Sequence, residues 1–95
     1  MNYRVRVPDG VRDLIESWGF SKRFQLDLYE QMIGLLSERP AGDIGDRIVA
    51  PIRCFRTHLD LCCPDVGRDL CVALWVNDTE EPGTRIVIHA EYREM

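Results

Sequence analysis

The chain has 95 residues, a formal net charge of −4, 45% apolar residues and 29% charged residues. This balance is typical of a single folded domain, residues 1–95, and excludes an intrinsically disordered chain. The negative charge argues against a broad electrostatic attraction to nucleic acid, although it leaves room for a local basic site. The cations are eleven arginines and one lysine. Arginine binds phosphate and carboxylate bidentately, but the base composition of the genome explains the same excess.

The N-terminal stretch MNYRVRVPDG contains no apolar run of signal-peptide length, and no segment reaches the length of a membrane span. We therefore expect a cytoplasmic protein with no membrane partner. In that compartment its four cysteines should be reduced.

The first half of the chain predicts a strand followed by two helices. Residues 3–7 alternate between apolar and cationic side chains, which is typical of a short strand. Residues 10–18 repeat apolar side chains at helical spacing, and Gly19 is a natural helix end. A second, longer helix follows the N-cap Ser21 and stops before Pro40. Its apolar stripe consists of Phe24, Leu28, Met32 and Leu35.

The second half predicts three strands. Residues 47–58, RIVAPIRCFRTH, read as one extended segment that carries Arg53 on one face and Arg56 on the other. Residues 60–69 read as a loop, and residues 70–76 as a central strand covered on both faces. Residues 85–92 alternate strictly. The alternation puts one set towards the core and one set away from it: Ile86, Ile88, Ala90 and Tyr92 inward; Arg85, Val87, His89 and Glu91 outward.

These elements predict an α+β fold in the order strand, helix, helix and three-stranded antiparallel meander. The helical hairpin should pack on one face of a four-stranded sheet, because nothing else can bury its apolar stripe. The opposite face should then display Arg53, Arg85 and His89 together.

This order of elements resembles the RelE/ParE superfamily of bacterial toxins. LLSERPAGDIGDRI resembles the end of that family's second helix and the connection after it. PIRCFRTHLD resembles its second strand, and DLCVALWVND with RIVIHAEYRE resembles its closing hairpin. The resemblance covers essentially the whole chain and implies a RelE/ParE-like fold.

The resemblance implies the toxin component of a type II toxin–antitoxin system. A cognate antitoxin would bind the chain in a hetero-oligomer, and a homodimer is an alternative assembly. RelE-like members inhibit translation by cutting mRNA in the ribosomal A site, with the 2′-hydroxyl as nucleophile and no metal or cofactor. Such an endoribonuclease (an mRNA interferase) needs a base, an acid and cations around the phosphate.

The resemblance also assigns roles to individual residues. The RNA-phosphate ligands would be Arg53, Arg56 and Arg93, and the catalytic residues would be His89, Arg85 and Tyr92. The residues themselves leave plainer interpretations open. His89 is also an ordinary exposed histidine, the arginines are also surface or salt-bridge residues, and Tyr92 is also a core residue.

Two features favour a non-catalytic alternative within the same superfamily. The chain is acidic, whereas RelE-like nucleases are strongly basic, and it offers few of the cations that such nucleases carry on this face of the sheet. Glu91, which falls beside His89, either orients the imidazole or repels RNA. The alternative is a protein that acts by binding another protein, as a ParE-like gyrase poison or an inactive descendant.

A metal site is the remaining alternative. Several soft ligands lie in the second half of the chain: Cys54, His58, Cys62, Cys63 and Cys71. Their spacing contains no CxxC pair, and free cysteines commonly behave as small apolar strand residues. We therefore expect no bound metal.

Overall fold

A computed structural model describes residues 2–41, 45–48, 53–63 and 67–94, without the side chains of residues 46, 60–63, 67–70, 93 and 94. The elements in chain order are β1 (Arg4–Arg6), α1 (Asp9–Ser17), α2 (Lys22–Glu38), β2 (Asp46–Ile48), β3 (Cys54–Cys63), β4 (Gly67–Asn77) and β5 (Thr84–Glu94). The predicted α+β class is confirmed. Neither helix is long and apolar enough to cross a membrane among the described residues.

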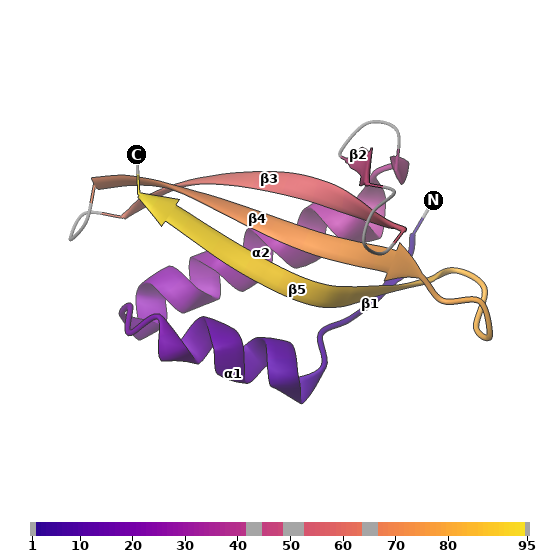
Figure 1. Ribbon diagram of the computed structural model, residues 1–95, viewed down its shortest axis with the longest axis horizontal. Helices are drawn as coiled ribbons and strands as arrows, with labels where there is room; N and C mark the ends of the chain where they lie inside the picture. The colour runs from indigo at the N-terminus through magenta and orange to yellow at the C-terminus, as the bar shows by residue number, and fades with distance from the viewer. Residues whose placement is uncertain (1, 42–44, 49–52, 64–66, 95) are drawn as a thin grey trace.

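The strands form one mixed sheet in the order β1-β5-β4-β3-β2, and both helices lie on one face of it (Figure 1). β3, β4 and β5 are antiparallel neighbours, whereas β1 runs parallel to β5 with Val5 opposite Arg85. The prediction of four strands is wrong by one, because β2 is a separate strand paired with the start of β3.

The predicted loop over residues 60–69 is largely strand. β3 continues to Cys63 and β4 begins at Gly67, and the two pair without interruption from Phe55 opposite Trp75 to Cys63 opposite Gly67. The backbone hydrogen bonds of this long ladder outweigh the weak strand preference of Asp and Gly in the sequence.

The helices begin and pack as their sequences dictate. Ser21 Oγ accepts a hydrogen bond from the Phe24 amide at 3.3 Å, which caps the N-terminus of α2. Gly19 has φ +77°, a backbone conformation that suits glycine between two helices. The helical residues buried against the sheet are Val11, Ile15, Phe24, Leu28, Met32 and Leu36.

A β-bulge in β5 changes which of its side chains face the core. Leu74 lies opposite His89 but Trp75 lies opposite Val87, so Ile88 is an extra residue in β5. Val87 and Ala90 are therefore both buried although they are three residues apart, and Ile88 is 37% exposed. The prediction that Ile86 and Ile88 face the core is wrong, because the alternation reverses its phase at the bulge.

Candidate functional site

The sheet face away from the helices carries a group of polar side chains. Strand register aligns Arg56, Leu74 and His89 in one row across β3, β4 and β5. The next row along the strands consists of His58, Val72 and Glu91. We define the open face by the side chains of Arg56, His58, Val72, Leu74, Val76, Ile86, His89 and Glu91.

A buried hydrogen bond on the opposite side of the sheet fixes the orientation of β3. Trp75 Nε1 donates to Thr57 Oγ1 at 2.8 Å, and both side chains are at most 2% exposed. Because neighbouring side chains of a strand point to opposite faces, inward Thr57 directs Arg56 and His58 to the open face.

The side chains of His89 and Glu91 are in polar contact on the open face. His89 Nε2 lies 3.4 Å from Glu91 Oε1, and the two side chains are 44% and 53% exposed. An interaction between groups this exposed adds little stability. The contact places the Glu91 carboxylate beside Nε2 of the His89 ring.

The open face therefore combines the groups that metal-independent RNA cleavage requires. Two imidazoles can accept and donate protons, and a guanidinium can stabilise charge on a phosphate. β3 and β5 are both neighbours of β4. The Cα atoms of Arg56 and His89 are therefore two strand spacings, about 10 Å, apart across Leu74. Sequence reasoning missed His58, and its two-residue spacing from Arg56 was the signal that could have found it.

Arg85 lies on the other side of the sheet, which corrects the expectation that it shares a face with His89. Its side chain is 2% exposed, and Nη1 donates hydrogen bonds to the carbonyl oxygens of Leu36 at 2.7 Å and Arg39 at 2.6 Å. Burial lowers the pKa of Arg85, and contact with Tyr3 opposes that shift. Arg85 therefore binds the C-terminal carbonyls of α2, where it also complements the helix dipole.

Two further predicted site residues, Tyr92 and Arg53, do not lie beside His89. The Tyr92 ring lies 5.8 Å from the Trp18 ring and 4.8 Å from the Phe20 ring, so it packs on the helix side. Arg53 is exposed just before β3. The side chain of Arg93 lies outside the described part of the structure. Among the predicted site residues whose side chains the structure describes, only Arg56 joins His89 on the open face.

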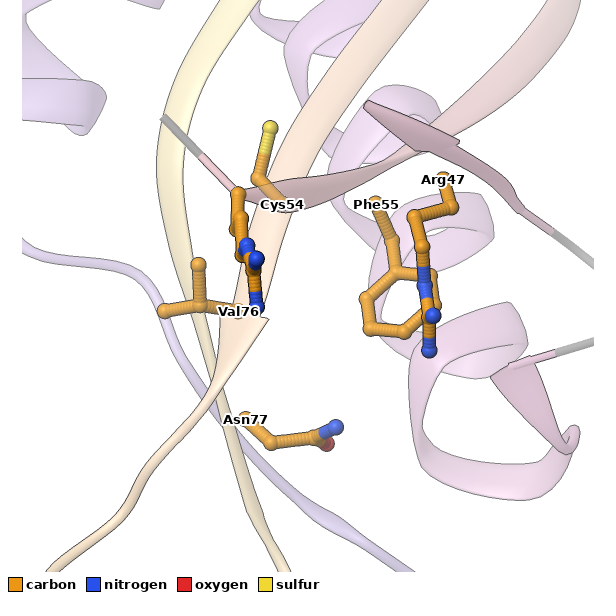
Figure 2. Close-up of a pocket in the computed structure, with 6 residues that line it drawn as sticks. Arg47, Cys54, Phe55, Val76 and Asn77 are labelled. Atoms are coloured by element: carbon orange, nitrogen blue, oxygen red, sulfur yellow. The ribbon is translucent and has the colours of Figure 1, made fainter. Parts of the chain in front are cut away.

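Arg53 instead lines a cavity of about 460 Å³ where β2, β3 and β4 come together. The described lining residues are Arg47, Arg53, Cys54, Phe55, Val76 and Asn77. Figure 2 shows the Arg47 guanidinium beside the Phe55 ring, with the Asn77 side chain across the opening from them. Arg47 has no signature of a site residue in the sequence, because residues 47–58 read as one continuous strand.

The cysteine and histidine residues do not form a metal site in the described part of the chain. Cys54 and Cys71 are both buried free thiols. Cys54 shares the strand face of Arg56, whereas Cys71 lies opposite Leu59 and in the core, so they cannot bind one ion together. The side chains of Cys62 and Cys63 lie outside the description. No group of three possible metal ligands occurs among the described residues.

Comparison with known proteins assigns no family to the chain, so the geometry of the open face and the cavity is the basis for a functional proposal. No protein-family model, curated protein sequence or solved structure matches the chain significantly.

Proposed function

We propose that this chain is the toxin of a RelE/ParE-type toxin–antitoxin pair and that it inhibits translation by cutting mRNA on the ribosome. The observation that carries the proposal is the row of Arg56, Leu74 and His89 on the open face, with His58 in the next row. This arrangement differs from the one expected from the sequence, since Arg56 and His58 replace Arg53 and Arg85 beside His89.

The architecture also supports the proposal. A first strand, two helices on one face and a final antiparallel meander are the features on which the resemblance to the RelE/ParE superfamily rests. Both helices lie on one face of the sheet, and neither of them covers the other face (Figure 1).

The chemistry assigned to the open face is an internal transesterification of RNA. One imidazole, His89 or His58, accepts the proton of the 2′-hydroxyl, and the 2′-oxygen then bonds to the adjacent phosphorus. The bond from phosphorus to the 5′-oxygen breaks, and the other histidine, as imidazolium, protonates that oxygen. The products are a 2′,3′-cyclic phosphate and a 5′-hydroxyl. Arg56 stabilises the charge on the phosphorane, and Glu91 orients His89.

The direct test measures mRNA cleavage in a cell-free translation reaction by primer extension. We expect His89→Ala and His58→Ala each to lower the cleavage rate by about 100-fold or more. Arg56→Ala should lower it by at least about tenfold. Arg23→Ala is the matched control, because Arg23 is exposed on α2 and far from the open face. Cleavage that persists unchanged in both histidine variants would refute the assignment.

The proposal includes a partner and a location. A translation inhibitor works in the cytoplasm, and the cell producing it requires an antitoxin that binds it in a hetero-oligomer. Co-expression with the product of an adjacent small gene should restore growth and yield a complex on gel filtration. Growth arrest that no neighbouring gene relieves would count against the toxin–antitoxin pairing.

A second candidate function is inhibition of a protein target, as by a gyrase poison, and the apolar centre of the open face favours it. Leu74, Val76 and Ile86 are half-buried, so an apolar strip lies among the polar groups. This function predicts that Ile86→Asp relieves growth arrest while His89→Ala does not. The nuclease proposal predicts instead that His89→Ala relieves growth arrest more than the substitution of the apolar residue.

A further inference from the structure

Five side chains form a continuous stack across the helix side of the sheet. In sheet order they come from the residue before β1 and from β5, β4, β3 and β2: Tyr3, Arg85, Trp75, Phe55 and Arg47. The Arg85 guanidinium carbon lies 3.5 Å from the centre of the Tyr3 ring and 4.6 Å from that of Trp75. The Trp75 and Phe55 rings are stacked at 4.6 Å, and the Arg47 guanidinium carbon is 5.9 Å from Phe55.

The stack holds Arg47 in place at the cavity. Trp75 is fully buried and is tied to Thr57, so Phe55 lies against a rigid surface. Arg47 then lies over Phe55 at the edge of the space that Figure 2 shows. A guanidinium positioned on an aromatic ring loses less conformational entropy when it binds a ligand than a free arginine does.

The composition of the cavity lining selects a ligand that is small and negatively charged. Arg47 and Arg53 supply two guanidinium groups, Asn77 supplies an amide, and none of the six described lining residues is acidic. The cavity volume of about 460 Å³ falls in the usual range for small-molecule sites, about 300–1,000 Å³.

We propose that this cavity binds a terminal phosphate monoester, carried by a free nucleotide or by the end of an RNA strand. A monoester has three terminal oxygens and a charge close to −2 at neutral pH, which two guanidinium forks and an amide can match. The phosphodiester within an RNA strand has one charge and two free oxygens, and it matches this donor set less well. The cavity shares Val76 with the open face, but its described lining includes neither Arg56 nor His89, so the proposal does not depend on RNA cleavage.

Isothermal titration calorimetry of the whole chain tests the proposal with five probes. They are inorganic phosphate, adenosine 5′-monophosphate, adenosine, and a short oligoribonucleotide in two forms, with and without a 5′-phosphate. We expect phosphate and the monophosphate to bind and adenosine not to bind. Preference for the phosphorylated oligonucleotide over the monophosphate would identify an RNA end as the source, and the opposite preference would identify a free nucleotide. Equal binding of adenosine and its monophosphate would overturn the proposal.

Substitutions of the cavity residues test whether they bind the monophosphate. Arg47→Ala and Arg53→Ala should each weaken binding of the monophosphate by about tenfold to 100-fold, whereas Arg23→Ala should leave it unchanged. Phe55→Leu keeps an apolar residue beside Trp75 but removes the ring under Arg47, and we expect a smaller loss of about threefold to tenfold. Equal affinities for Arg47→Ala, Arg53→Ala and Arg23→Ala would overturn the proposal.

Two further measurements separate this site from the nuclease proposal. His89→Ala should bind the monophosphate as the unmodified chain does, and a parallel loss in that variant would overturn the separate site. Lowering the pH from about 7.5 to about 5.5 protonates a phosphate monoester and should weaken its binding, while sulfate keeps its charge and its affinity. Equal pH dependence for the two anions would count against recognition of the dianion.

Discussion

Arg85 donates a hydrogen bond from Nη1 to the carbonyl oxygen of Leu36, which lies forty-nine positions earlier in the chain, at 2.7 Å. The same nitrogen reaches the carbonyl oxygen of Arg39, so one cation of β5 binds the end of α2. A helix end leaves backbone carbonyls without intrahelical partners, and in a buried position an unpaired carbonyl costs free energy. Arg85, which the sequence suggests as a catalytic residue, thus has a structural role.

The first prediction tests that role. Arg85→Met keeps a long apolar side chain between Tyr3 and Trp75 but cannot donate a hydrogen bond, and it should lower the free energy of unfolding by about 2 kcal/mol. Arg85→Ala, which also leaves a cavity, should lower it by about 3 kcal/mol or more. Urea denaturation followed by circular dichroism measures both, with Arg23→Ala as the control. Unchanged stability in Arg85→Met would mean that desolvating the guanidinium costs as much as its contacts contribute.

A second prediction concerns the buried hydrogen bond between Trp75 and Thr57. Trp75→Phe leaves the Thr57 hydroxyl without its donor, and Thr57→Val leaves the indole N–H without its acceptor. Each variant should lose about 1–3 kcal/mol of unfolding free energy. The double variant should lose less than the sum, because it removes both polar partners together. Strict additivity in the urea-denaturation cycle would show that the two groups do not interact in solution.

The bulge in β5 provides a third prediction, which distinguishes neighbouring residues. Val87 is fully buried and Ile88 is 37% exposed. Val87→Ala should therefore lower the free energy of unfolding by about 2 kcal/mol, whereas Ile88→Ala should change it by less than about 0.5 kcal/mol. Thermal unfolding of both variants measures the difference. If β5 had no bulge and Ile88 faced the core, as the sequence predicts, Ile88→Ala would lower the free energy of unfolding more than Val87→Ala.

A fourth prediction separates orientation of His89 from stability. Glu91→Gln keeps the size of the side chain and removes its charge, and the exposed contact at 3.4 Å contributes little to folding. The melting temperature should stay within about 1 °C, while the single-turnover rate of RNA cleavage should fall by about threefold to tenfold. Glu91→Gln with the rate of the unmodified chain would show that the carboxylate does not position the imidazole.

The sequence predicts the class of fold because periodicity is a local property. The stripe of Phe24, Leu28 and Met32 and the cap at Ser21 are visible without any tertiary contact, and the structure has both. The separation of β2 from β3 was not visible, because apolar and β-branched residues continue through that region of the sequence. The continuation of β3 to Cys63 depends on pairing with β4 and has no signature in either segment alone.

The candidate site was harder to predict, because it depends on the phase of two strands relative to each other. Strict alternation puts Arg85 and His89 on one face, four residues apart. One inserted residue at Ile88 puts them on opposite faces, and no property of the β5 sequence locates that insertion. The sequence puts Arg56 on the strand face opposite that of Arg53, but its proximity to His89 requires the register of all three strands.

The contact between Tyr3 and Arg85 also bears on how the chain is made. β1 can find its place in the sheet only beside β5, which is the last of the strands to leave the ribosome. Domains whose first and last segments pair must wait for nearly complete synthesis before they close. A nascent copy therefore remains without the β1–β5 part of its core until β5 has left the ribosomal exit tunnel.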